Sequence, residues 1–164
     1  MNCIMRSARP ADIPGVLAIY NDAVLHTTAV YTYDPLTPEM MQQWYKDKMD
    51  KDLPVFIAEV DGSVAGFASY GPFRPWPAYK HTVEHSIYVN KDFRRQGIAK
   101  KLLQLLIDTA QKKNVHTIVA GIDSQNEVSI SLHKTFGFKE VGQLFEVGYK
   151  FDRWLDLKFM QLIL

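Results

Sequence analysis

The chain has 164 residues, with 19 Lys and Arg against 18 Asp and Glu, so its formal charge is +1. Hydrophobic residues make up 47% and charged residues 23%, which is typical of a globular domain and excludes disordered, collagenous and coiled-coil proteins. A single cysteine, Cys3, excludes an internal disulfide framework and a cysteine-rich zinc site. The sequence shows no membrane-length apolar run and no signal peptide, and its near-neutral charge disfavours a nucleic-acid partner. We therefore expect one cytoplasmic domain over residues 1–164, with no membrane or nucleic-acid partner.

The first half of the chain mixes strand and helix patterns. Apolar residues at helical spacing predict a helix that opens at Pro10 and fades near Val24, and a second helix begins near Pro38. Asp61-Gly62 predicts a hairpin turn, whereas three prolines predict that residues 71–79 form a loop. Runs of β-branched and aromatic residues predict strands at residues 3–7, 55–60, 64–70 and 82–89.

The second half contains the clearest helix, over residues 97–113, because leucines recur along one side and polar residues along the other. A shorter helix is predicted over residues 127–135, with Gly137 as its C-terminal stop. Strands are predicted at residues 115–122, 139–149 and 154–164. This order of elements predicts an α/β protein with a mixed sheet.

Positive charge is concentrated between Lys91 and Lys101, where five cations and one anion give a net charge of +4. The cations lie where a strand gives way to the long helix, and a helix N-terminus offers unpaired N–H groups. Gly97 and Ala99 are small enough for a ligand to approach this backbone closely. The pattern favours a phosphate site, and a solvated basic turn is the alternative. It lacks the glycines of a nucleotide P-loop or a dinucleotide fingerprint.

The segment His81-Thr82-Val83-Glu84-His85 matches the H-x-x-E-H spacing of inverted zinc proteases, which need both histidines on one face of a helix. The segment continues with a strand composition, so its side chains alternate and Glu84 points away from His81 and His85. We therefore expect no metal site.

Glu84 lies in the middle of a strand that should be central, where charged residues rarely stand unpaired. In one interpretation the carboxylate faces a cleft, has a raised pKa and acts as a base near neutral pH. In the other it forms an ion pair, for example with Arg74. The residues alone leave both open.

Two segments resemble the GNAT superfamily of N-acetyltransferases. Arg94-Arg95-Gln96-Gly97-Ile98-Ala99 is similar to its Arg/Gln-x-x-Gly-x-Gly/Ala pyrophosphate loop, and Asn126 with Leu132-His133-Lys134-Thr135-Phe136-Gly137-Phe138 is similar to its second acetyl-CoA segment. The resemblance covers essentially the whole chain. Runs such as Tyr70-Gly71-Pro72-Phe73-Arg74 and Trp154-Leu155-Asp156 resemble the phosphinothricin and methionine sulfoximine acetyltransferase branch.

This resemblance implies the GNAT fold, a mixed and mostly antiparallel sheet of about seven strands with about four helices. It also implies a homodimer that moves an acetyl group from acetyl-CoA to the α-amine of a small amino-acid analogue. Phosphinothricin, L-methionine sulfoximine and L-methionine sulfone are the expected substrates.

The resemblance further implies direct transfer within a ternary complex, with Glu84 as general base and the Val89 backbone N–H as the donor to the carbonyl oxygen. Most members have a tyrosine where this chain has His133, so His133 either protonates the leaving thiolate or packs locally. The expected acetyl-CoA contacts come from the strand backbone, the pyrophosphate loop and one amide: Ile87, Tyr88, Val89, Arg94, Arg95, Gln96, Gly97, Ile98, Ala99, Lys100 and Asn126.

A free amino acid carries a carboxylate, which arginine meets best with a two-point fork, so Arg74 is the expected partner. It lies in the proline-rich loop beside Pro75 and Trp76, and Trp76 is also a candidate for a dimer contact or plain packing. Thr28, Tyr31 and His85, together with Glu84, are expected to line the same pocket.

Two further functions stay open on sequence grounds. The first is acetylation of another amine, such as a polyamine, an aminoglycoside or a protein N-terminus, which would favour an acidic entry groove. The second is an acyl-CoA-binding module without turnover, against which the presence of Glu84 argues.

Overall fold

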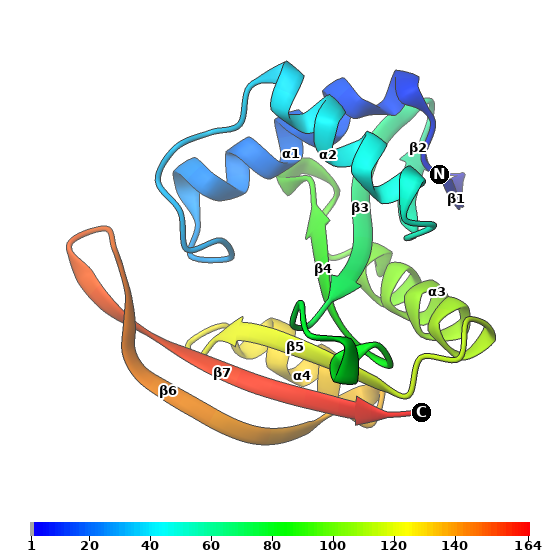
Figure 1. Ribbon diagram of the computed structural model, residues 1–164. Helices are drawn as coiled ribbons and strands as arrows, with labels where there is room; N and C mark the ends of the chain where they lie inside the picture. The colour runs from blue at the N-terminus through cyan, green and yellow to red at the C-terminus, as the bar shows by residue number, and fades with distance from the viewer. Residues whose placement is uncertain (1) are drawn as a thin grey trace.

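The computed structural model describes residues 2–164 and shows a seven-stranded sheet with the order β1-β2-β3-β4-β5-β7-β6 (Figure 1). All neighbouring strands are antiparallel except β4 and β5, which are parallel. The strands are β1 (Cys3–Ser7), β2 (Val55–Val60), β3 (Ser63–Pro72), β4 (Thr82–Val89), β5 (Thr117–Asp123), β6 (Lys139–Lys150) and β7 (Arg153–Ile163). The predicted mixed sheet is confirmed.

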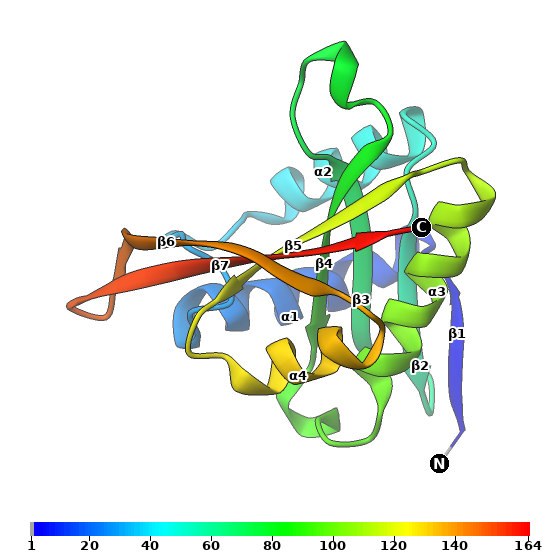
Figure 2. The ribbon, with the colours of Figure 1, turned by 90° about the horizontal axis from the view of Figure 1, so that it is seen from below.

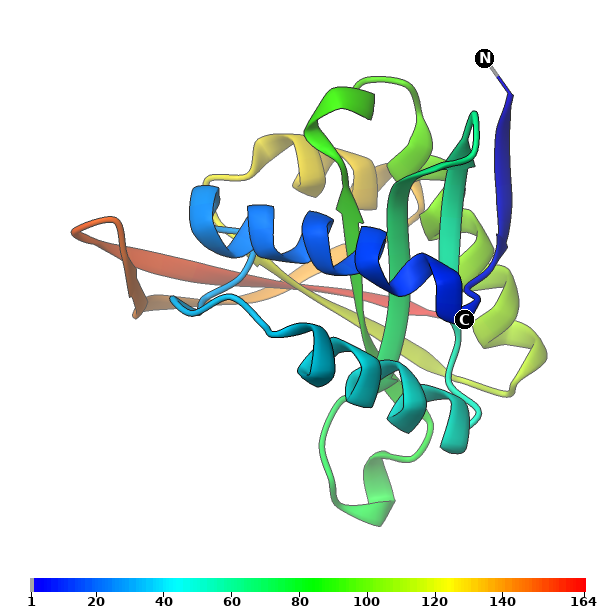
Figure 3. The same ribbon diagram turned by 90° about the horizontal axis from the view of Figure 1, so that it is seen from above.

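Within the described residues four α-helices flank the sheet: α1 (Ile13–His26), α2 (Pro38–Asp50), α3 (Ile98–Lys112) and α4 (Glu127–Thr135). Helices α1 and α2 cover one face of the sheet (Figure 3). Val16 and Met41 of these helices belong to one buried cluster with Phe67 of β3. Helices α3 and α4 lie on the opposite face, seen from below in Figure 2, and their apolar side chains join those of β4, β5 and β7 in the larger core. None of the helices within residues 2–164 is long and apolar enough to cross a membrane.

Local sequence accounts for most element boundaries. The Thr37 side chain accepts a hydrogen bond from the Met40 N–H and caps α2, and Gly137, with a φ of 88°, follows the end of α4. The bounds of β4 and α4 match the predicted ranges residue for residue. At the start of α1 the prediction is one turn too long, because residues Pro10–Asp12 form a 3-10 turn.

The predicted loop at residues 71–79 also needs a correction, because β3 continues to Pro72. The Asn90 N–H bonds to the Ala65 carbonyl, and hydrogen-bonded pairs alternate along an antiparallel ladder. By this alternation Pro72 and its partner Val83 form a non-hydrogen-bonded pair. Proline is tolerated there because the ladder requires no N–H from it.

Strands β4 and β5 pair over only three residues each, Thr82–Glu84 with Thr117–Val119. Beyond Glu84 the two strands diverge, as Figure 1 shows. The sheet therefore opens beside the second half of β4.

Strands β6 and β7 form a long hairpin that projects beyond the rest of the sheet (Figure 1). Two irregularities in the register lie along it. It carries a group of exposed apolar and aromatic side chains, here called the hairpin surface: Leu144, Phe145, Val147, Tyr149, Phe151 and Trp154.

Candidate active site

The backbone of β4 directs two N–H groups into the opening between β4 and β5. The alternation that starts at the Asn90–Ala65 hydrogen bond makes Val89–Gly66 and Ile87–Ala68 non-hydrogen-bonded pairs. The N–H groups of Val89 and Ile87 therefore point away from β3, toward the side where β5 has left the ladder. Tyr88 differs: its backbone faces β3, and its ring packs on Phe67 and Tyr20. The structure thus brings two of the three predicted backbone contacts to the opening.

Glu84 lies on the sheet face that α1 and α2 share, at the point where β4 and β5 separate. A Cβ atom added to Gly121 of β5 would lie 3.2 Å from the Glu84 Oε1 atom, so the missing side chain at Gly121 leaves room for the carboxylate. Burial raises the pKa of the Glu84 carboxyl, and the positive charge of Arg74 opposes that rise. The environment fits a base that works near neutral pH.

Arg74 does not form the ion pair considered for Glu84. Within residues 2–164 no ion pair joins the two side chains at 4.0 Å or less, and the Arg74 guanidinium lies 4.7 Å from the Phe73 ring centroid. Arg74, Pro75 and Trp76 are exposed and line a cavity of about 410 Å³ with Tyr70 and Lys113. Within residues 2–164 the guanidinium has no carboxylate partner. It is therefore available to bind the carboxylate of a substrate.

The segment between α1 and α2 reaches the same face as Glu84. The Thr28 hydroxyl donates a hydrogen bond to the Asp123 carboxylate, and Asp123 lies two residues after Gly121 on β5. Residues two apart on a strand share a face, so Thr28, Asp123 and Glu84 lie on one side of the sheet. The Tyr31 hydroxyl donates to the Asp156 carbonyl at 3.0 Å, and burial raises the Tyr31 pKa to about 12, helped by Asp123 and Asp156.

His85 requires a correction, because it does not share the pocket of Thr28 and Tyr31. Its side chain lies on the opposite face from Glu84, where it stacks on His133 of α4 at 5.0 Å between ring centroids and contacts the Phe138 ring edge-on. The alternation of side chains along β4 is the physical reason. Residues Thr82–Val89 form strand β4, and Glu84 and His85 lie on opposite faces of the sheet. This confirms the prediction that the H-x-x-E-H segment is a strand whose glutamate points away from His85.

His133 is 3% exposed and both of its ring nitrogens have partners. Nδ1 lies 2.7 Å from the Ser129 carbonyl, which only accepts, so Nδ1 carries the hydrogen. Nε2 must then accept from His85 Nε2 at 2.9 Å, which leaves His85 Nδ1 as a buried acceptor without a partner. Burial lowers the pKa of His133, and burial together with His133 lowers the pKa of His85 to about 3. The pair is therefore neutral, with no His133 proton available to a thiolate in this arrangement.

The basic segment before α3 forms a tight backbone loop. Gly97 caps the helix with a φ of 75°, and Arg95 has a φ of 62°, which is uncommon for a residue with a side chain. The first intrahelical bond runs from the Lys101 N–H to the Gly97 carbonyl, so the N–H groups of Ile98, Ala99 and Lys100 have no acceptor in the helix. The Ile98 side chain is buried, and the side chains exposed around these N–H groups are Arg94, Arg95, Gln96 and Lys100.

Asn126 has a role that the sequence analysis did not assign. Its Oδ1 atom accepts a hydrogen bond from the Ser129 N–H at 3.1 Å and caps α4. Its amide nitrogen keeps two hydrogens for another partner. The sequence signal for the cap was present, since Asn126 precedes an acidic first turn.

Three functional candidates were missed: Gly121, Asp123 and Lys150. Gly121 gives no signal because its role depends on a side chain from a neighbouring strand. Asp123 and Lys150 are both less than 10% exposed, and both contact the segment between α1 and α2 from far along the chain. Nothing in their local sequence indicates these partners.

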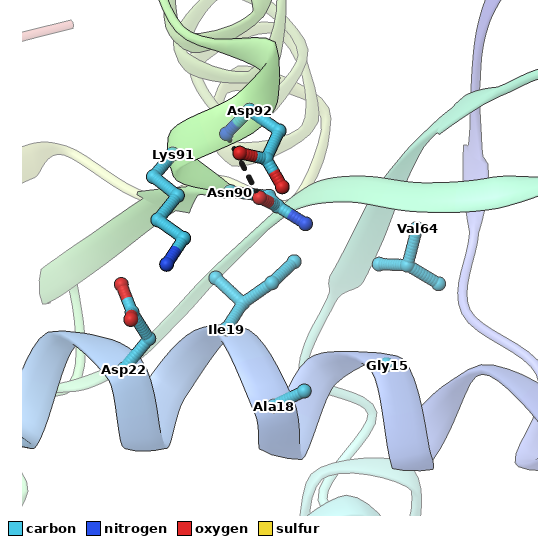
Figure 4. A pocket seen from close by; sticks show the side chains of 8 residues that line it. All are labelled: Gly15, Ala18, Ile19, Asp22, Val64, Asn90, Lys91 and Asp92. Carbon is cyan, nitrogen blue, oxygen red and sulfur yellow. Dashed lines mark hydrogen bonds between the residues drawn. The ribbon is translucent and has the colours of Figure 1, made fainter.

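A second hollow of about 260 Å³ lies between α1 and the end of β4, and Lys91 and Asp22 point toward one another across it (Figure 4). Gly15 and Val64 also line it. None of the predicted site residues lines it.

The sequence resembles known acetyltransferases over most of its length. The model of the acetyltransferase (GNAT) family matches residues 19–138. The L-methionine sulfoximine/L-methionine sulfone acetyltransferase of Pseudomonas aeruginosa is 46% identical over 163 residues, which cover 99% of this chain and 95% of that protein.

Two solved structures resemble the fold closely. An N-acetyltransferase from Staphylococcus aureus Mu50 superposes with a TM-score of 0.98 at 53% identity, over 99% of each chain. A phosphinothricin acetyltransferase of the GNAT superfamily from Sinorhizobium meliloti, in complex with AcCoA, superposes with a TM-score of 0.97 at 33% identity, over 100% of this chain and 89% of that one. These matches confirm the predicted fold.

Proposed function

Because the chain belongs to the acetyltransferase (GNAT) family, we propose that it transfers the acetyl group of acetyl-CoA to the α-amine of phosphinothricin, L-methionine sulfoximine and L-methionine sulfone. The relatives named above support this substrate class. The observation that carries the proposal is the position of Glu84, a half-buried carboxylate with a raised pKa on the strand whose N–H groups face the opening. The working unit is the single domain of residues 1–164, acting in the cytoplasm.

The residues along β4 and in the loop that follows it fit acetyl-CoA. The opening beside β4 offers the N–H groups of Ile87 and Val89 to an extended pantetheine arm, as a neighbouring strand would be held. A Cβ atom added to Gly97 would meet nothing within 4 Å, so space remains beside the N–H groups at the start of α3. Exposed cations surround these groups, which suits a pyrophosphate.

Acetyl-CoA supplies an activated acetyl thioester when it is bound. Glu84 takes a proton from the substrate ammonium, directly or through water, because only a neutral amine attacks a carbonyl carbon. The Val89 N–H stabilises the negative charge that develops on the carbonyl oxygen. Formation of the amide C–N bond breaks the C–S bond of the thioester. The nitrogen loses its second proton as the amide forms, and the departing thiolate gains one proton to become the CoA thiol. Donation by His133 remains a prediction that requires the pair with His85 to open.

We assign the substrate carboxylate to Arg74, and Thr28 and Tyr31 to the pocket wall. Arg74 has no carboxylate partner within residues 2–164 and lies close enough to Glu84 to affect its pKa. A two-point contact at Arg74 would place the α-amine of an amino acid toward the base.

We also propose a homodimer that forms through the hairpin surface. Large apolar side chains exposed together on a projecting element are typical of protein contacts. Phe145→Glu should shift the sedimentation coefficient from dimer to monomer. Leu25→Glu, at an exposed site on α1, should leave it unchanged.

A thiol-release assay tests the proposed reaction. Purified enzyme with acetyl-CoA should release CoA in the presence of the sulfoximine, the sulfone or phosphinothricin. Spermidine and an aminoglycoside serve as comparison amines. Turnover of these amines alone would contradict the substrate class, and acetyl-CoA binding without any turnover would indicate a binding module.

A further inference from the structure

A buried lysine from the far end of the chain holds the segment between α1 and α2. Lys150, the last residue of β6, is 4% exposed, and its ammonium donates to the carbonyls of Thr27 at 2.7 Å and Val30 at 2.8 Å. Burial lowers the Lys150 pKa, and no carboxylate within residues 2–164 lies in ion-pair distance of it. A buried charge is costly unless polar groups compensate it, so both carbonyls must stay in place.

A glycine two residues earlier on β6 receives the ring of Tyr31. A Cβ atom added to Gly148 would lie 2.7 Å from Tyr31 Cδ2, a separation that real Cβ atoms do not show. The Tyr31 hydroxyl is fixed at the same time by the Asp156 carbonyl on β7. The hairpin of β6 and β7 therefore sets both the backbone and one side chain of the segment.

The held segment connects directly to the face that carries Glu84. Thr28 lies between the two carbonyls that Lys150 binds, and its hydroxyl donates to Asp123. Asp123 also raises the pKa of Tyr31, which shows that the carboxylate and the phenol are close. Loss of the lysine would free residues 27–31 and so displace Thr28 and Tyr31 together.

We propose that Lys150 is a positioning residue for the amino-acid substrate: its two hydrogen bonds hold residues 27–31 in the conformation that makes Thr28 and Tyr31 one wall of the substrate pocket. This inference rests on the proposed function. Lys150 contacts neither the opening beside β4 nor the loop before α3, so it acts on the binding of the amine and leaves the binding of acetyl-CoA unchanged.

Lys150→Met removes the charge and the donors while it keeps most of the side-chain volume. We expect the KM for L-methionine sulfoximine to rise about tenfold or more, because small displacements of positioning groups have large effects. The KM for acetyl-CoA should stay within about twofold. Lys158→Met is the matched control: Lys158 lies on the same hairpin but pairs with Glu140, and this variant should keep both values.

A purely structural role would lower the fraction of active enzyme and hence the apparent kcat, with KM for the amine unchanged. That result overturns the proposal. If Lys150→Met does not fold, Gly148→Ala tests the same proposal, because it displaces Tyr31 and keeps the lysine. An unchanged KM for the amine in Gly148→Ala overturns the proposal equally. A wild-type enzyme that acetylates no amino-acid analogue would overturn the proposed function and this inference together, whereas wild-type turnover with unaltered variants overturns the inference alone.

Discussion

The start of α3 and the wall formed by residues 27–31 are built in opposite ways. The first is local: Arg95 and Gly97 turn the backbone within a few residues, and the helix that follows leaves its own N–H groups free. The second is assembled from a distance, because residue 28 bonds to residue 123, residue 31 to residue 156, and residue 27 to residue 150. Under the proposed function, acetyl-CoA would meet a self-contained loop at the start of α3, and the amine would meet a surface that β5, β6 and β7 hold in place.

Glu84→Gln should have the largest effect, because it should lower turnover and leave the binding of acetyl-CoA at the α3 loop intact. The variant keeps the shape of the side chain but cannot accept a proton from the ammonium, so kcat should fall about 10²–10⁴-fold. Affinity for acetyl-CoA, measured by calorimetry, should stay nearly constant because Glu84 does not contact the α3 loop. Glu59→Gln, which alters a strand carboxylate paired with Arg6, is the control and should keep wild-type turnover. Unchanged turnover in Glu84→Gln would remove Glu84 from the base role.

Gly97→Val tests whether the local loop binds the coenzyme. The β-branched side chain disfavours a φ of 75° and covers the helix N–H groups, so the Kd for acetyl-CoA should rise about tenfold or more. Gly62→Val is a close match, since Gly62 has a φ of 79° and equally open surroundings in the turn between β2 and β3. Both variants should lose similar stability, but only the first should lose affinity. Equal affinities in the two variants would refute the pyrophosphate assignment.

Arg74→Ala tests the amine side with a smaller expected effect than Glu84→Gln. A hydrogen bond to a charged group contributes about 1.5–3 kcal/mol, so the KM for substrates with a free carboxylate should rise about 10–100-fold. Their carboxamides should show a much smaller change. Lys80→Ala, at an exposed cation in the same loop, is the comparison variant. Equal rises in KM for the free amino acids and for their carboxamides would contradict the proposal that Arg74 binds the substrate carboxylate.

The smallest effect concerns stability in acid. The folded state keeps His85 neutral with a pKa of about 3, whereas the unfolded chain protonates it near pH 6.5, so stability falls as pH drops below 6.5. Between pH 7 and pH 5 this linkage amounts to about 2 kcal/mol. His85→Gln removes the titration and should flatten the loss measured by urea unfolding. His116→Gln, which replaces an exposed histidine, is the control and should lose as much unfolding free energy between pH 7 and pH 5 as the wild type. The same loss in His85→Gln would contradict a neutral pair of His85 and His133.

The alternation of side chains along β4 shows how much of the site could be predicted from the sequence. It placed Glu84 and His85 on opposite faces correctly, and the assignment of His85 to the pocket of Thr28 and Tyr31 conflicted with that rule. The contact between His85 and His133 was beyond the sequence, since the two residues are 48 positions apart and only the packing of α4 on the sheet joins them. Asn126 was predicted to contact acetyl-CoA, whereas its helix-capping role was not predicted.

The sequence by itself determined the strands and helices and the turn that opens the start of α3, because these depend on residues a few positions apart, and the order of these elements indicated a mixed sheet. Side-chain periodicity, capping residues and glycines with positive φ act at this range. Only the tertiary structure decided which carboxylate stands beside Gly121, which lysine holds residues 27–31, and that His133 is occupied by His85. These contacts follow from the order and register of β4, β5, β6 and β7, and strand pairing over long separations leaves no mark in the local sequence.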